Sequence, residues 1–140
     1  MSVERFCRKP LVFARPTDSV AHAARLMLEH HVGAVVVVDE AQHPLGIITD
    51  RDITTRIVAQ GRDPGATAVS VAMTLKPAVL PRHATIDDAS LIMRQRGVRR
   101  LPIVDEGKRL AGVVTFDDLN VLFCAELGQL MGAVHENQGP

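Results

Sequence analysis

Aromatic residues are nearly absent from this sequence of 140 residues, which has four Phe and neither Trp nor Tyr. A core without large rings must be filled by Val, Ile, Leu, Met and Ala, as is typical of helices packed on a sheet. Charge of one sign is also lacking, because 16 Lys and Arg residues balance 16 Asp and Glu residues. Nucleic-acid binding usually requires a basic stripe or a high pI, so this balance argues against it. A small anionic ligand needs only a few local cations and stays compatible with the composition.

Long hydrophobic runs and cysteine pairs are scarce as well. Apolar runs are short, such as Val35–Val38, whereas a membrane span needs about 20 residues. The first ten residues have no apolar core of a signal peptide. Cys7 and Cys124 lie near opposite ends, and we expect them to be reduced thiols buried as small hydrophobic side chains. These features predict a soluble cytoplasmic protein with no membrane partner.

What the sequence does contain is an internal repeat. A shift of 66 positions aligns residues 16–57 with residues 82–123 without a gap. Helical periodicity, turns and a polar motif are repeated together, which indicates a duplication. The identical pairs are Ala23/Ala89, Met27/Met93, Val32/Val98, Val38/Val104, Asp39/Asp105, Glu40/Glu106, Gly46/Gly112, Thr49/Thr115 and Asp52/Asp118.

Each repeat predicts the same order of elements. The expected strands are 11–14, 34–38 and 45–49 in the first repeat, and 77–80, 101–104 and 111–115 in the second. The first helix of each repeat is expected to follow Ser19 or Thr85 and to stop at Gly33 or Gly97. The second helix is expected to begin near residue 50 or 116. The predicted fold class is α/β (α+β), with two β-α-β-β-α repeats packed about a pseudo-twofold axis.

The repeat also predicts the division of the chain. We expect residues 1–68 to form the first repeat with its N-terminal strand, residues 69–134 the second with a C-terminal helix, and residues 135–140 a frayed tail. The final helix is apolar over more than one face, so it needs a partner surface. Glu126 and Gln129 argue against a membrane there, and a homodimer contact is the favoured interpretation.

The strongest polar motif is residues 46–52, echoed at residues 112–118. Both segments read glycine, two β-branched residues, threonine, two variable residues and aspartate, at the junction of a strand and a helix. A structural interpretation is a capping box, in which the threonine and the aspartate close the first turn of the helix. A functional interpretation is that the helix N-terminus and hydroxyl attract phosphate, while the carboxylate accepts bonds from ribose hydroxyls. The motif alone leaves both interpretations open.

Arg99 and Arg100 form a second polar element, between a helix end and a buried strand. They are either a solvated pair near a helix C-terminus or guanidinium clamps for phosphate. The first repeat has Gly33 and Ala34 at the matching positions, which predicts one charged site and one less charged or empty site.

Signals for catalysis are missing. The six histidines are scattered, and His30 and His31 are adjacent, so they are expected on different sides of a helix in surface or structural roles. No Cys/His pair has metal-ligand spacing, and there is no glycine-rich phosphate loop or nucleophile elbow. We therefore expect no enzyme, no required cofactor and no metal site.

The repeated glycine–threonine–aspartate motif and the run of residues 99–105, Arg-Arg-Leu-Pro-Ile-Val-Asp, together resemble a tandem pair of CBS domains, or Bateman module. The resemblance covers residues 10–123. The segments 49–53, 61–64 and 71–74 are most similar to the stand-alone bacterial type. The resemblance implies two clefts between the repeats, an adenosine ligand such as AMP, ADP, ATP or S-adenosylmethionine, and disc-like homodimers paired through helices.

The resemblance also implies site residues by position. In one cleft Thr115 would contact phosphate or ribose, Asp118 the ribose hydroxyls, and Arg100 with Arg99 the phosphate. The base pocket of that cleft would be lined by Val12, Val32, Gly33 and Ala34. The other cleft would use Thr49 and Asp52 in the motif roles, Arg51 for phosphate, and walls from Ala78, Val79 and Val98.

Three functions compete at this point. The first is a regulatory sensor that binds an adenine nucleotide and acts on an unknown effector protein. The second is a ligand-free dimeric interaction module, in which the threonine–aspartate motifs are only helix caps. The third, a small nucleotide hydrolase, has the least support in the sequence.

Overall fold

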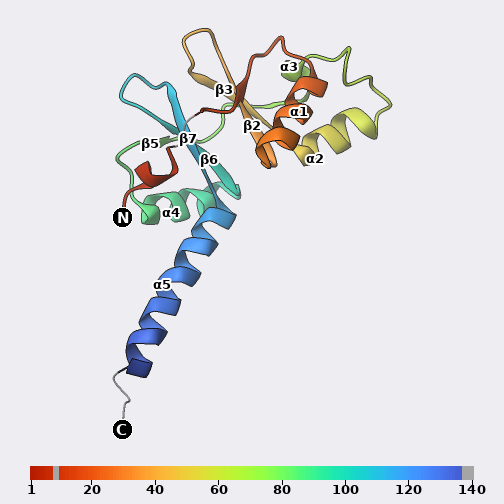
Figure 1. The fold of residues 1–140 in the computed structure, drawn as a ribbon. Helices are drawn as coiled ribbons and strands as arrows, with labels where there is room; N and C mark the ends of the chain where they lie inside the picture. The colour runs from red at the N-terminus through yellow and green to blue at the C-terminus, as the bar shows by residue number, and fades with distance from the viewer. Residues whose placement is uncertain (8–9, 137–140) are drawn as a thin grey trace.

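The computed structural model describes residues 1–7 and 10–136, and it contains two small sheets that adjoin at the centre of the molecule (Figure 1). The first sheet has the order β1 (Phe13–Ala14), β2 (Ala34–Val38), β3 (Pro44–Thr49) and β4 (Thr74–Leu75). The second has the order β5 (Leu80–Pro81), β6 (Arg100–Val104) and β7 (Leu110–Thr115). In the first sheet β2 runs parallel to β1 and antiparallel to β3. In the second sheet β6 runs parallel to β5 and antiparallel to β7.

The strand registers repeat at the shift seen in the sequence. Ala14 pairs with Val37, and Leu80 pairs with Ile103. Ala34 pairs with Thr49 at the end of the first hairpin, as Arg100 pairs with Thr115 at the end of the second. Even the bulge is duplicated, between residues 37 and 38 and between residues 103 and 104. The predicted fold class, two similar α+β repeats packed about a pseudo-twofold axis, is confirmed.

The first helix of each repeat begins at its predicted cap. The Ser19 hydroxyl accepts a hydrogen bond from the His22 amide at the start of α1 (Val20–His30), and Thr85 forms a capping box with Asp88 at the start of α4 (Ile86–Arg96). The α4 helix ends at Gly97, which has a φ of 63°, as predicted. The stop predicted at Gly33 is wrong, because α1 ends with left-handed His31, the residue equivalent to Gly97.

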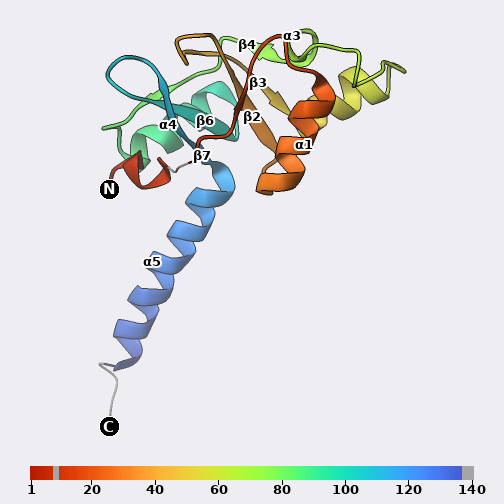
Figure 2. The same cartoon turned by 45° about the horizontal axis from the view of Figure 1, so that its top comes forward.

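The second helices begin where predicted but differ in form. The first is a single turn, α2 (Asp50–Asp52), which continues as a π-helical segment, η2 (Ile53–Val58). The second, α5 (Phe116–Glu136), is a continuous helix of 21 residues that extends away from the body in both views (Figures 1 and 2). The helix runs two residues past residue 134, where the predicted tail begins, and residues 137–140 lie outside the described residues.

Each half has its own hydrophobic core, and a third cluster joins them. The joining cluster contains buried Val36, Val38 and Leu110, with Phe13 and Val113 packed against it. A hydrogen bond from the Leu110 amide to the Gln42 carbonyl, 2.9 Å long, also crosses between the halves. Contacts of β1 and β2 with β7 therefore hold the two halves together.

The halves also exchange their first segments. The 3-10 helix η1 (Val3–Phe6) packs in the core of the second half, whereas α3 (Val69–Ala72) packs in the core of the first. The Val3 amide bonds the Ala84 carbonyl at 2.9 Å, and the Val69 amide bonds the Asp18 carbonyl at 2.7 Å. The proposed division into residues 1–68 and 69–134 follows the sequence repeat, while the packing crosses it in both directions.

The motif glycines make this exchange possible. A Cβ at Gly112 would lie 2.6 Å from the Phe6 carbonyl oxygen, and one at Gly46 would lie 2.8 Å from the Thr74 carbonyl oxygen. In both halves, therefore, the backbone of the incoming segment crosses directly over the motif glycine. Strand β4, which the sequence analysis did not predict, is one of these crossings, where Thr74 pairs with Ile47.

The two cysteines are both free, but they are not both buried. Cys7 is half-buried, and Cys124 is exposed on α5, so the expectation of two buried thiols is wrong. Cys124 is exposed because α5 leaves the body of the protein after its first two turns. Among the described residues, no helix combines the length and apolarity needed to cross a membrane.

The crossing at Gly112 can be tested through stability. We expect Gly112→Ala to lower the unfolding midpoint by about 3–10 °C, since forcing a methyl group against backbone costs about 1–3 kcal/mol. The matched control is Gly128→Ala in α5, where an added Cβ meets nothing within 4 Å. The control should leave the midpoint unchanged or raise it slightly, because Ala favours a helix over Gly. Equal midpoints for the two variants in thermal unfolding would contradict the close crossing.

Candidate functional site

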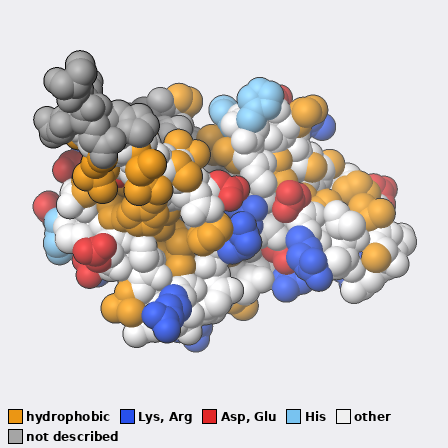
Figure 3. Space-filling model, turned by 90° about the horizontal axis from the view of Figure 1, so that it is seen from below, with side chains coloured by type: hydrophobic (Ala, Val, Ile, Leu, Met, Phe, Trp, Pro, Cys, Tyr) orange, Lys and Arg blue, Asp and Glu red, His pale blue; other side chains and the backbone are white. Residues whose placement is uncertain are grey.

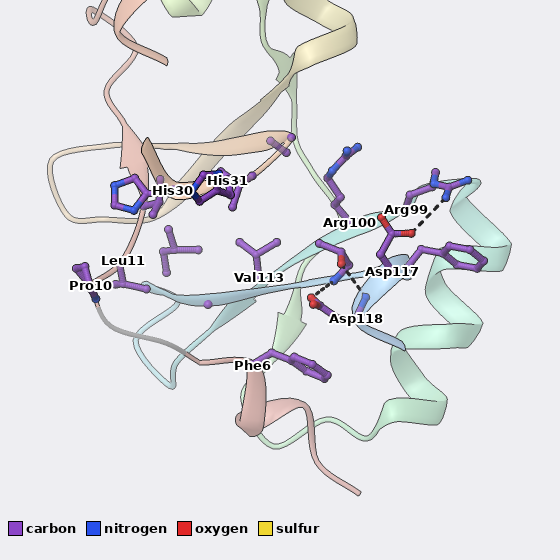
Figure 4. Close-up of a pocket in the computed structure, with 18 residues that line it drawn as sticks. Phe6, Pro10, Leu11, His30, His31, Arg99, Arg100, Val113, Asp117 and Asp118 are labelled. Atoms are coloured by element: carbon purple, nitrogen blue, oxygen red, sulfur yellow. Dashed lines mark hydrogen bonds and ion pairs between the residues drawn. The ribbon is translucent and has the colours of Figure 1, made fainter. Parts of the chain in front are cut away.

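A cavity of about 430 Å³ lies between the two halves. It is lined by all eight residues predicted for the first cleft: Val12, Val32, Gly33, Ala34, Arg99, Arg100, Thr115 and Asp118. Residues that the sequence analysis did not place there complete the lining: Phe6, Pro10, Leu11, His30, His31, Leu110, Gly112, Val113, Phe116 and Asp117. The close-up shows the arginines and aspartates at one end and the two histidines at the other, with Val113 between them (Figure 4).

The threonine and aspartate of the motif meet at the base of α5. The Thr115 amide donates to Asp118 Oδ2 at 3.0 Å, and the Asp118 amide donates to Thr115 Oγ1 at 3.0 Å. The capping interpretation of the motif is therefore correct. It uses only one carboxylate oxygen, because Asp118 Oδ1 has no hydrogen-bond or ion-pair partner among the residues that the structure describes. The same carboxylate is thus available to a ligand in the cavity.

Arg100 lies at the first position of β6, opposite Thr115 in the hairpin register. Its guanidinium packs beside Gly33, where an added Cβ would lie 2.9 Å from Arg100 Nη2 and 3.3 Å from Asp50 Oδ2. Within the described part of the chain, Arg100 forms no salt bridge. Gly33 therefore makes room for a half-buried cation that has no carboxylate partner within 4.0 Å, which is the property of an anion-binding group.

Arg99 is held differently. Its guanidinium lies 4.7 Å from the centroid of the Phe116 ring, and its Nη2 lies 3.7 Å from Asp117 Oδ1. Both side chains of this ion pair are largely exposed, so the pair contributes little to stability. Arg99 is consequently at the rim of the cavity, already engaged, and Arg100 is the better-placed cation of the two.

The position of the histidines corrects the sequence analysis. We expected His30 and His31 on different sides of a helix, but both line this cavity. The reason is that α1 ends at His30 and the backbone then turns left-handed at His31, with a φ of 55°. Helical spacing no longer applies after the last helical residue, so periodicity could not have located them.

The second predicted cleft has the same motif geometry, but its residues line neither of the two cavities described here. The Thr49 amide donates to Asp52 Oδ2 at 2.9 Å, and the Asp52 amide donates to Thr49 Oγ1 at 3.1 Å. Its predicted walls are partly used elsewhere, since Ala78 and Val98 pack against the core of the second half. None of the residues predicted for this cleft lines either of the two cavities described: Thr49, Arg51, Asp52, Ala78, Val79 and Val98.

A second cavity, of about 310 Å³, includes Cys7, Arg82 and Arg109. Arg82 pairs with Glu4 at 2.9 Å and Arg109 with Asp105 at 3.2 Å, so both cations already have carboxylate partners. Burial raises the pKa of the Cys7 thiol, and this outweighs the opposing effect of Arg82. A thiol of raised pKa is a poor nucleophile at neutral pH, so this cavity carries no signal of catalysis.

The described residues also contain no group of three or more His, Cys, Asp and Glu side chains that could hold a metal ion. The main cavity offers binding groups: an apolar middle, a carboxylate and two arginines at one end, and two histidines at the other.

Sequence comparison identifies the family. The model of the CBS domain matches residues 3–59 and 68–122, and this chain therefore belongs to the CBS-domain family, with two copies of the domain. The CBS domain-containing protein YhcV of Bacillus subtilis is 43% identical over 106 residues, which cover 76% of this chain and 74% of the relative. Protein MK0525 of Methanopyrus kandleri is 34% identical over 119 residues, or 85% of this chain, but the match spans only 61% of that relative.

Solved structures agree with this assignment. The CBS domain pair of protein MJ0100, in complex with 5′-methylthioadenosine and S-adenosyl-L-methionine, superposes with a TM-score of 0.80 and 26% identity, covering 90% of this chain and 98% of that one. The CBS-domain containing protein ATU1752 of Agrobacterium tumefaciens gives a TM-score of 0.75 and 31% identity, covering 87% and 98%. The fold is that of a CBS domain pair.

The three capping boxes provide a stability baseline for the site. We expect Asp88→Ala, which removes the box of α4 outside the main cavity, to lower the free energy of unfolding by about 1 kcal/mol. Asp118→Ala should cost a similar amount, and Asp52→Ala at least as much, because Asp52 also pairs with Arg56 at 3.6 Å. Denaturant unfolding of the three variants measures these costs. An Asp118→Ala protein as stable as the wild type would show that this cap contributes nothing.

Proposed function

We propose that this protein is a regulatory sensor that binds an adenosine-containing nucleotide in the cavity between its two CBS repeats. The observation that supports it is the combination, in one cavity, of an uncommitted Asp118 carboxylate oxygen and an Arg100 guanidinium without a carboxylate partner. A carboxylate that recognises two vicinal hydroxyls and a cation that recognises phosphate fit the two polar parts of a nucleotide.

The cavity suits the parts of such a ligand in order. The apolar side chains of Val12, Val32 and Ala34 offer a surface for the base, as the resemblance to the family implied. The ribose would bind Asp118, and the phosphate would lie near Arg100, with Thr115 and the N-terminus of α5 adding amide and hydroxyl donors. Arg99 at the rim would then contribute only after leaving Asp117. The adenosine ligands of the MJ0100 domain pair support the same ligand class.

In this proposal the protein is not an enzyme, requires no cofactor, and acts in the cytoplasm on a separate effector protein. Ligand binding would favour one arrangement of the two halves to the extent that the ligand contacts both of them more tightly in it. Gly33 and Arg100 come from different halves and meet in the cavity, so a bound nucleotide would touch both.

The binding itself is tested by thermal unfolding with AMP, ADP, ATP, S-adenosylmethionine and NADH, and with GTP as a control ligand. A ligand at 100 times its dissociation constant stabilises the folded state by about 2.7 kcal/mol, or about 5–10 °C for a chain of this size. Asp118→Ala should weaken binding about 10- to 150-fold, the value of a hydrogen bond to a charged group. Dye or calorimetric detection is needed, since the sequence has no Trp or Tyr.

Asp88→Ala is the matched control, because it loses an equivalent capping box in α4 and is not among the residues that line the cavity. It should be destabilised but keep the full ligand-induced shift. Unfolding curves that no ligand moves at millimolar concentration would overturn the sensor and favour the ligand-free interaction module.

We further propose that the functional unit is a homodimer formed through α5. From Phe123 to Val134 every side chain of this helix is exposed. Four of its apolar residues recur at alternating spacings of four and three, Phe123 (49% exposed), Leu127 (59%), Leu130 (63%) and Val134 (48%), and Met131 (58%) lies beside them. This is the spacing of a coiled-coil seam, and an identical helix is the partner that matches it along its whole length. Figure 3, which views the molecule from below, shows a patch of hydrophobic side chains on this face.

The proposed dimer contact of α5 is tested by placing a charge in it. Leu127→Glu places a carboxylate in the seam and should convert the dimer to a monomer in analytical ultracentrifugation at micromolar concentration. Gln129→Glu adds the same charge outside the a and d positions and should leave the dimer intact. A wild-type protein that sediments as a monomer, or a Leu127→Glu dimer, would overturn the seam.

A further inference from the structure

The two motif aspartates are equivalent in sequence and in capping, but their second oxygens have different surroundings. In the second half, Asp118 Oδ1 has no partner among the described residues and Asp118 lines the main cavity. In the first half, Asp52 Oδ1 lies 3.6 Å from Arg56 Nη2. The Asp52 side chain is 14% exposed and that of Arg56 is 44% exposed, so the carboxylate of this pair is shielded from water while the guanidinium lies at the surface.

Arg56 is fixed in this position by the segment that enters from the second half. Its Nη1 donates to the Ala72 carbonyl at 2.8 Å and to Thr74 Oγ1 at 3.3 Å. The guanidinium therefore bridges η2, α3 and β4 and cannot leave Asp52 without giving up these bonds. In the second half the equivalent of Arg56 is Leu122, which is 8% exposed and packs in the hydrophobic core. The side chain of Leu122 has no polar atom and so cannot pair with the Asp118 carboxylate.

The pair of adjacent arginines that would hold a phosphate is also confined to one side, whereas the other cleft has the single Arg51 predicted for it. Arg99 and Arg100 line the main cavity, and the matching positions of the first repeat are Gly33 and Ala34. The space beside Gly33 is occupied by the guanidinium of Arg100 and the carboxylate of Asp50. The first-repeat motif thus lacks both a free carboxylate oxygen for a ribose and a neighbouring arginine pair for a phosphate.

We infer that the protein binds one nucleotide per chain, at Asp118, and that Arg56 keeps the equivalent cleft at Asp52 from accepting a ribose. The inference rests on the proposed nucleotide-binding function and adds its stoichiometry and the residue that sets it. The duplication has therefore left one binding half and one half whose motif serves only as a helix cap and an anchor for the exchanged segment.

The test is isothermal titration of the full chain with AMP, ADP, ATP and S-adenosylmethionine, each alone. The wild type should bind one molecule per chain. Asp118→Ala should lower the affinity about 10- to 150-fold. Asp52→Ala removes an equivalent capping box and should keep one site with an affinity within about twofold of the wild type. Unfolding curves of both variants, recorded without ligand, establish that each is folded at the titration temperature.

Arg56→Leu copies the residue of the second half and frees Asp52, so a second and weaker binding event should appear. Two molecules bound per wild-type chain, or a loss of binding in Asp52→Ala equal to that in Asp118→Ala, would overturn the single site. A titration of Arg56→Leu that still shows one event would overturn the role given to Arg56. Binding of none of the four ligands to the wild type is a different result, which would refute the sensor function itself.

Discussion

The close crossing of backbone over the two motif glycines is the constraint on which the rest of this structure depends. At Gly112 the segment that carries Phe6 approaches too closely for any side chain, and at Gly46 the segment that carries Thr74 does the same. Each half thereby completes its core with residues of the other repeat. Val3 and Phe6 pack in the core of the second half, and Val69 and Ala72 pack in the core of the first. Neither half has a complete core without the exchanged segment, so the pair is one cooperative unit.

The site is a product of that exchange. The main cavity takes its lining from η1, from the segment before β1, from the end of α1 and from the hairpin and helix of the second half. Its polar groups are positioned by short-range features that are strong individually: a capping box for Asp118, a hairpin register for Arg100 and a left-handed turn for His31. The packing of the two halves against each other then brings these local features together around the apolar middle of the cavity.

Much of the fold and of the main cavity was predictable because each sequence motif occurs twice, so that one copy supports the interpretation of the other. The strand order, the four helix starts and all eight residues of the first cleft follow from the repeat and from its resemblance to a family, and the structure brings those eight residues together.

The errors have physical causes. The end of α1 was placed at Gly33 because glycine favours a left-handed cap, but His31 adopts that conformation and Gly33 is small to admit Arg100. The exchange of segments was invisible, since periodicity describes neighbours along the chain and not partners across it. The engagement of Asp52 by Arg56 was missed for the same reason, although Leu122 in the aligned position was a signal that the two halves had diverged.

The geometry of α5 has a mechanical consequence. The helix begins in the cavity wall at Phe116 and runs without a break for 21 residues, or about 30 Å at 1.5 Å per residue. Its side chains from Phe123 to Val134 are all exposed, so this part of the helix follows the movement of its first turns at the cavity wall. A tilt of about 5° at the cap would move the tip by roughly 2.6 Å over that length, which is more than half the spacing of neighbouring strands. A displacement of a few tenths of an ångström at the cavity wall would therefore become a larger displacement at the tip of α5. The rigid helix itself transmits it, without a chain of side-chain contacts between the two points.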